Sequence, residues 1–203
     1  MRTFVIAEAA ACHDGDYSKA RQLVLQAKDI GADAVKFQWC GNPKRLAQRR
    51  NASEYLPSYN LLNFPRDWHE ELSRIAQYHG LEYMSTVYLP EDIPVVAPYV
   101  SRFKVASFEA GDTAFVEAHR KYHKPVIVSC GMNAGSGGTH WLHCVSAYPT
   151  PIDQINLARI RDFYDGLSDH TTHPLTGALA VAAGASIIEF HMRLFTTSPD
   201  NAD

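Results

Sequence analysis

The sequence lacks three features, and each absence argues against a class of protein. Its 203 residues contain no apolar run long enough to span a membrane. The first apolar run meets acidic Glu8 at once, which does not suit a signal peptide. A formal net charge of -3 provides no basic surface for nucleic acid. We therefore expect a cytoplasmic protein that binds neither membranes nor nucleic acid.

Paired cysteines and glycine-rich nucleotide motifs are also absent. The four cysteines form no Cys-x-x-Cys pair, so we expect reduced thiols. No Gly-x-Gly-x-x-Gly opens a helix after a predicted strand, which argues against a doubly wound dinucleotide-binding sheet. Such an open sheet remains the alternative architecture.

Short apolar runs alternate with segments of helical periodicity along the whole chain. A hydrophobic content of 46% is enough for one sizeable core. Strands are predicted at residues 4–8, 34–38, 81–86, 103–107, 125–129, 140–144, 165–168 and 186–189. Buried parallel strands that alternate with helices predict an α/β fold, a closed (β/α)8 TIM barrel that occupies residues 1–203 as a single domain.

This barrel is expected to be abbreviated. Glycine-rich residues 131–138 are too few for a helix after the fifth strand, and no closing helix follows the eighth. Residues 39–60 are predicted to form a polar loop before a helix around Trp68. Because missing helices leave apolar barrel surface uncovered, we expect a homo-oligomer.

Charged and hydroxyl side chains follow the predicted strands, and in a barrel these carboxyl ends converge on one mouth. Lys36 and Lys104 together indicate an anion site, although either alone also fits a structural ion pair. Glu8 and Glu109 are candidate general bases or hydroxyl acceptors, with ion pairing to those lysines as the alternative. Hydroxyl donors, or helix caps if taken singly, are Thr86, Ser107, Ser129 and Ser168.

Two histidines, His170 and His191, end neighbouring predicted strands. Two imidazoles without a third protein ligand leave open positions on a divalent ion such as Mn²⁺, Fe²⁺ or Co²⁺, and a satisfied core histidine is the alternative for either alone. His143 is a competing ligand that we expect to serve in packing. Surface positions are expected for His13, His69, His79, His119, His123 and His140.

These motifs together resemble the sialic acid synthase family, the phosphoenolpyruvate-dependent synthases of N-acetylneuraminate and of legionaminic and pseudaminic acid. The matching stretches follow the family order over nearly the whole chain, and as a set they are highly specific. They are residues 6–8, 13–16, 31–38, 84–86, 103–107, 124–132, 142–149, 166–171, 188–191 and 199–200.

The resemblance implies a role for each candidate. It assigns His170 and His191 to a divalent metal, Mn²⁺ first, with Mg²⁺, Co²⁺ or Fe²⁺ as alternatives. It places Glu8 beside the reacting carbons. The implied phosphoenolpyruvate ligands are Lys36, Thr86, Lys104, Ser107, Ser129 and Ser168, with Ser146 where the family often has Asn. The implied contacts to an acceptor amino sugar are Gln38, Glu109, Tyr148 and Asp200.

The implied reaction condenses phosphoenolpyruvate with an open-chain N-acylhexosamine such as N-acetylmannosamine and releases phosphate. The family usually carries a C-terminal antifreeze-like domain, which residues 1–203 do not contain, so a separate companion domain is one expectation. The alternatives are the same chemistry on another aldose or aldose phosphate, and a non-catalytic barrel subunit. The presence of every charged and metal-binding position favours the synthase.

Overall fold

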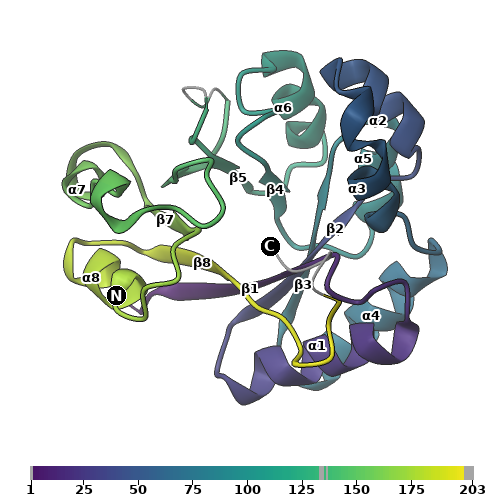
Figure 1. Ribbon diagram of the computed structural model, residues 1–203, viewed down its shortest axis with the longest axis horizontal. Helices are drawn as coiled ribbons and strands as arrows, with labels where there is room; N and C mark the ends of the chain where they lie inside the picture. Colours follow the sequence, from purple (N-terminus) through teal and green to yellow (C-terminus); the bar gives the residue numbers. More distant parts are fainter. Residues whose placement is uncertain (1, 133–134, 136, 199–203) are drawn as a thin grey trace.

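In the described part of the chain, eight parallel strands close into a barrel, each paired with the next and the eighth with the first (Figure 1). The computed structural model describes residues 2–132, 135 and 137–198. The strands are β1 (Phe4–Ala10), β2 (Ala34–Trp39), β3 (Glu82–Val87), β4 (Phe103–Val105), β5 (Val126–Ser129), β6 (His140–His143), β7 (Gly166–Asp169) and β8 (Ile187–His191). This topology confirms the predicted (β/α)8 TIM barrel.

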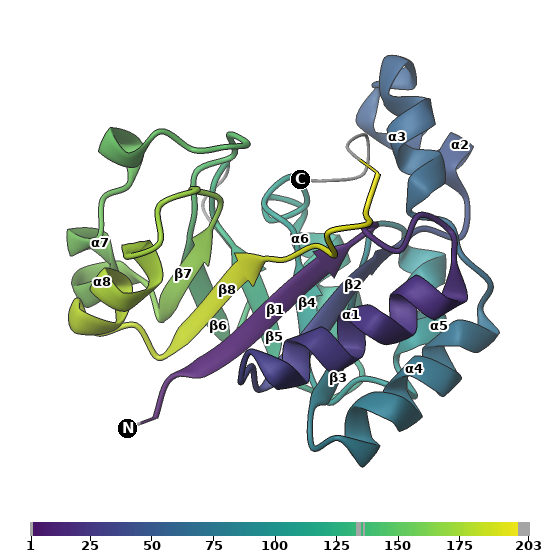
Figure 2. The same cartoon turned by 60° about the horizontal axis from the view of Figure 1, so that its bottom comes forward.

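Helices cover the outside of the barrel where amphipathic sequences follow the strands. The chain forms α1 (Tyr17–Asp29), α4 (Asp67–Tyr78), α5 (Ile93–Val96), α6 (Thr113–Arg120), α7 (Ala158–Phe163) and α8 (Thr176–Ala182). α1 begins where the Asp16 carboxylate accepts from the Ser18 amide, and its apolar side, including Leu23 and Ala27, is fully buried. α1 and α4 lie side by side over β1 to β3 (Figures 1 and 2).

The predicted polar loop after the second strand is wrong, because most of it is helical. It contains α2 (Pro43–Arg50), a 3-10 turn (Ser53–Tyr55) and α3 (Leu56–Leu61). Asn42 caps α2 by accepting from the Arg45 amide, and a proline follows it at the first helical position. Most residues of α2 are polar, and only Leu46 and Ala47 are buried. Both helices stand at the carboxyl end of the strands (Figure 2).

The predicted gap in the helical ring after the fifth strand is present in the part of the chain that the structure describes. No helix joins β5 to β6 among the described residues. After β8, residues 192–198 run without a helix over the loop that follows β1. There the Met192 amide donates to the Glu8 carbonyl at 2.8 Å, and the Thr197 hydroxyl donates to the Cys12 carbonyl at 3.0 Å. This segment fixes the end of β8 against the end of β1.

The interior of the barrel is layered along the strands. An apolar layer fills its lower part, formed by Ile6, Ala34, Met84, Ile127, Leu142 and Ile187. Because alternate residues of a strand face the same side, the next inward positions toward the carboxyl ends carry Glu8, Lys36, Thr86, Ser129 and Glu189. The core therefore ends where the polar mouth begins.

Three of the histidines expected at the surface are buried, so that prediction is wrong for them. His13, His69 and His119 are 0% exposed and lie in aromatic clusters. Burial lowers the pKa of His13 and His119 to about 4 and that of His69 to about 3. These imidazoles are neutral core residues.

The remaining composition-based predictions have simpler outcomes. All four cysteines are buried free thiols, as expected. Among the described residues, no helix combines the length and apolar character needed to cross a membrane.

Candidate active site

Two buried lysines form the floor of the mouth. The Lys36 ammonium contacts the Glu8 carboxylate and donates to the Thr86 hydroxyl at 2.9 Å. The Lys104 ammonium donates to the Ser129 hydroxyl at 2.7 Å. Strand register places Glu8 beside Lys36 and Thr86 beside Lys104. Both lysines are at most 3% exposed, so their charges are paired within the barrel and do not reach solvent.

Glu189 joins the two lysines, although it is not among the site residues predicted from the sequence. Its Oε2 lies 3.6 Å from the Lys36 ammonium, and its Oε1 lies 3.5 Å from that of Lys104. The Ser168 hydroxyl also donates to Oε1 at 2.7 Å. Burial opposes ionisation of this carboxyl, but the two ammonium groups and the hydroxyl hold its pKa well below the usual range.

The sequence contained one indication of this residue. Glu189 precedes His191 by two positions in the same strand, so both side chains face the barrel interior. Two lysines and two glutamates therefore form a charge-balanced layer, which we call the lysine–glutamate layer: Glu8, Lys36, Lys104 and Glu189. Its ammonium groups are already oriented by hydroxyls, an arrangement that suits a phosphate or carboxylate ligand.

The two predicted metal ligands lie one layer above. The rings of His170 and His191 are 5.3 Å apart between centroids and inclined at 75°. His170 Nδ1 lies 2.7 Å from the Val145 carbonyl. Because a carbonyl oxygen only accepts hydrogen bonds, Nδ1 carries the proton and Nε2 has a free lone pair. Nε2 accepts a hydrogen bond from the Tyr148 hydroxyl at 3.1 Å.

Both imidazoles are suited to binding a cation in their neutral form. Burial, and the neighbouring His170 ring, lower the pKa of His191 to about 3, and burial lowers that of His170. No group of three or more His, Cys, Asp or Glu side chains that could hold a metal occurs among the described residues. Two imidazoles are too few donors for a closed structural zinc site, and they would leave open coordination positions on a divalent ion.

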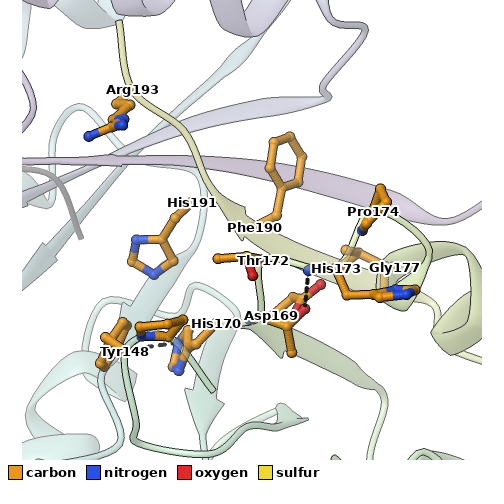
Figure 3. A pocket seen from close by; sticks show the side chains of 13 residues that line it. Tyr148, Asp169, His170, Thr172, His173, Pro174, Gly177, Phe190, His191 and Arg193 are labelled. Carbon is orange, nitrogen blue, oxygen red and sulfur yellow. Dashed lines mark hydrogen bonds between the residues drawn. The ribbon is translucent and has the colours of Figure 1, made fainter. Parts of the chain in front are cut away.

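A second cavity opens beside the histidines, between the ends of β7 and β8 and the loop before α8. It encloses about 770 Å³, within the size range of small-molecule sites. Figure 3 shows Tyr148 and His170 together beneath His191, with Phe190 and Pro174 on the opposite side. Tyr148, His170 and His191 also line the barrel mouth, so the two spaces adjoin at these residues.

The other predicted ligands are divided between the mouth and its rim. Gln38, Ser107 and Tyr148 line the mouth. The Ser107 and Ser146 hydroxyls lie 2.9 Å apart, with Ser146 exposed at the rim. Asp200 lies outside the described residues.

Two further candidates lie away from the mouth. Glu109 is not among the residues that line the mouth. The alternative that it pairs with Lys36 or Lys104 is wrong, because it pairs with Arg50. His143 packs near the Tyr164 ring at 5.5 Å, and its Nε2 accepts from the Asn156 amide at 3.3 Å, which agrees with a packing role.

Comparison with known proteins establishes the family. The sequence profile described as the NeuB family matches residues 23–202. The chain belongs to the NeuB family. This assignment confirms the resemblance found in the sequence motifs.

Individual relatives of this NeuB-family chain have related names. It is 31% identical to the pseudaminic acid synthase of Campylobacter jejuni, over 95% of this chain and 66% of that protein. It is 32% identical to the N,N'-diacetyllegionaminic acid synthase of Legionella pneumophila, over 98% of this chain and 66% of that protein. The chain thus spans slightly less than two thirds of the length of these curated relatives.

A solved relative has the same fold. The N-acetylneuraminic acid synthetase of Leptospira borgpetersenii, crystallised in complex with citrate, superposes with a TM-score of 0.85 at 27% identity. The superposition covers 95% of this chain and 74% of that one.

Proposed function

We propose that this chain is the barrel of a synthase that condenses phosphoenolpyruvate with an N-acylhexosamine aldehyde similar to N-acetylmannosamine. The products are a sialic-acid-like nonulosonic acid and phosphate. The observation that carries the proposal is the lysine–glutamate layer directly beneath the His170 and His191 pair on a NeuB-family barrel. The names of the relatives, synthases of nonulosonic acids, support the same reaction class.

Phosphoenolpyruvate is assigned to the lower part of the mouth. Lys36 and Lys104 supply charge for its phosphate and carboxylate, and Thr86, Ser129 and Ser168 lie within hydrogen-bonding distance of the charged groups that they orient. Ser107 and Ser146 are assigned to the rim of the same site.

His170 and His191 are assigned to a divalent ion, Mn²⁺ first, with Mg²⁺, Co²⁺ and Fe²⁺ as alternatives. When bound, such an ion supplies Lewis acidity to a carbonyl oxygen. The protein contributes the fixed tautomer of His170, through the Val145 carbonyl, and the Tyr148 ring stacked on it at 4.2 Å between centroids.

The lysine–glutamate layer also suits the bond changes. The methylene carbon of phosphoenolpyruvate bonds to the aldehyde carbon, whose oxygen takes up a proton to become a hydroxyl. Water adds to the former enol carbon, and the bond from that carbon to the phosphate oxygen breaks, which leaves a ketone and phosphate. Lys36 and Lys104 stabilise the charge on the departing phosphate. Glu8 is assigned as the base that takes the proton of water, because Glu109 pairs with Arg50 and does not line the mouth.

An aldose phosphate is the second candidate for the acceptor. Arg193 lines the cavity beside His170 and His191, where its cation offers a partner for an anionic end of the sugar. N-Acylhexosamines and aldose phosphates are therefore tested side by side.

The test is phosphate release from phosphoenolpyruvate with Mn²⁺, scanned over N-acetylmannosamine, its 6-phosphate and other aldoses. We expect release that depends on one acceptor class and stops with a chelator. Absence of release with every acceptor would contradict an independently active synthase. Binding of phosphoenolpyruvate in that case would favour a companion domain or a non-catalytic barrel.

We also propose a homo-oligomer. Phe163 on α7 is 72% exposed, and Leu175, just before α8, and Leu179 on it are 57% and 50% exposed, so this side of the barrel presents apolar surface. Light scattering with size-exclusion chromatography tests this, and a monomeric mass of 22.6 kDa would contradict it.

A further inference from the structure

A largely buried cation, Arg50, is held at the carboxyl end of α2 by a carboxylate and three aromatic rings. Arg50 Nε and Nη2 both donate to Glu109 Oε1, at 2.8 and 2.5 Å. The guanidinium carbon lies 4.4 Å from the ring centre of Phe108, 4.9 Å from that of Tyr88 and 5.4 Å from that of Tyr59. The Arg50 side chain is 12% exposed, so these contacts fix both it and the rings around it.

One of those rings reaches the mouth. Tyr88 directly follows β3, and its hydroxyl donates to Gln38 Oε1 at 2.6 Å. Gln38 and Tyr88 both line the mouth, and Gln38 lies one inward position beyond Lys36 on β2. Because the amide oxygen of Gln38 is engaged by Tyr88, the amide nitrogen with its two N–H donors is the group left for a ligand.

We propose that Tyr88, held in place by Arg50 and Glu109, is a positioning residue that fixes the Gln38 amide as a hydrogen-bond donor to an oxygen of the acceptor sugar. The acceptor part of this inference rests on the proposed function. An amide fixed in advance loses little rotational freedom on binding, and an acceptor without the matching oxygen leaves the N–H group unpaired. Glu109 then serves as the anchor of Arg50, which differs from the role of base considered for it.

The first test is Tyr88→Phe, which keeps the ring beside Arg50 and removes only the hydroxyl. We expect the KM for N-acetylmannosamine to rise by about tenfold, the effect of losing one well-placed hydrogen bond, while kcat and the Kd for phosphoenolpyruvate change little. Tyr55→Phe is the matched control, because Tyr55 lies in the 3-10 turn after α2 and its side chain is exposed. An unchanged KM in Tyr88→Phe would overturn the inference.

The second pair of variants tests the anchor. Arg50→Lys keeps the charge but loses the double contact to Glu109, and we expect a KM increase in the same direction as for Tyr88→Phe. The matched control is Arg49→Lys. In the wild type, the Arg49 guanidinium pairs instead with the half-exposed Asp112 carboxylate at 2.6 Å. Equal KM values for the two arginine variants would remove Arg50 from the proposal.

A readout without turnover separates this inference from the proposed function. The side-chain amide signals of Gln38 are followed by NMR in the ligand-free chain, assigned through Gln38→Glu. We expect Tyr88→Phe to shift and average these signals and Tyr55→Phe to leave them in place. A fixed Gln38 amide in Tyr88→Phe would overturn the positioning role. If the unmodified chain consumes no acceptor, the proposed function fails, and the NMR comparison still decides whether Tyr88 positions Gln38.

Discussion

Buried charges determine the character of the mouth at the scale of single residues. Each ammonium of the lysine–glutamate layer faces a carboxylate and a hydroxyl. Removal of any one charged member therefore leaves a buried charge without its partner, which destabilises the fold. This mutual dependence makes Glu189 as important to the layer as the lysines, although no substrate role was assigned to it from the sequence.

Glu189→Gln removes one charge and keeps the shape of the side chain. We expect the free energy of unfolding to fall by about 3 kcal/mol, because the buried Lys104 ammonium then loses the Glu189 carboxylate as its partner. Urea denaturation measures the change. Glu117→Gln is the control, since Glu117 pairs with Arg120 at the surface and should cost less than about 0.5 kcal/mol. Equal losses in the two variants would contradict the account of the layer.

At the scale of elements, the close approach of β7 and β8 brings the two histidines together. A Cβ at Gly166 would lie 1.8 Å from the Ile187 carbonyl oxygen, so only glycine allows this pairing. The same two strands end at His170 and His191, one residue beyond β7 and at the last residue of β8. The spacing of His170 and His191 thus depends on a glycine at the opposite end of the strands.

Gly166→Ala should therefore damage the barrel. We expect the free energy of unfolding to fall by about 3 kcal/mol, with loss of soluble protein as the extreme outcome, because backbone must move to admit the methyl group. Gly177→Ala is the matched control within α8, where the nearest atom to a new Cβ is 3.8 Å away and helix propensity improves. A wild-type denaturation midpoint for Gly166→Ala would contradict this packing argument.

The elements differ in how far the sequence could predict them. The strands were predictable because each is a short apolar run, and the lysines and histidines were noticeable because they interrupt or end those runs. α2 was missed because most of its residues are polar and only Leu46 and Ala47 are buried. The pairing of Arg50 with Glu109 joins residues 59 positions apart, and no local pattern records such a contact.

Neutral buried histidines make the free energy of unfolding of the whole molecule depend on pH. Because burial lowers the pKa of His119 from 6.5 to about 4, the unfolded chain binds its proton first as the pH falls. The contribution of His119 to stability is therefore complete above pH 6.5 and is lost progressively toward pH 4, at about 1.4 kcal/mol per pH unit. His13 and His69 act in the same sense.

His119→Gln should remove the contribution of one histidine to the pH dependence of the free energy of unfolding. Between pH 6.5 and 5 we expect this contribution to be about 2 kcal/mol. Urea denaturation of the variant and the wild type at these two pH values measures it. The difference between the proteins is the decisive quantity, because burial raises the pKa of Asp92 to about 6, which stabilises the fold as the pH falls below 6. Parallel pH profiles would contradict a neutral His119.

The most direct test of the central claim is titration calorimetry of phosphoenolpyruvate into the full chain in the presence of Mn²⁺. The lysine–glutamate layer predicts binding by the wild type and a loss of at least about tenfold in affinity for Lys104→Ala, with Mn²⁺ affinity little changed. The control is Lys28→Ala, because Lys28 is exposed in the last turn of α1, and we expect it to bind phosphoenolpyruvate with the affinity of the wild type. No binding by the wild type, or equal binding by a folded Lys104→Ala, would contradict the assignment of this mouth to phosphoenolpyruvate.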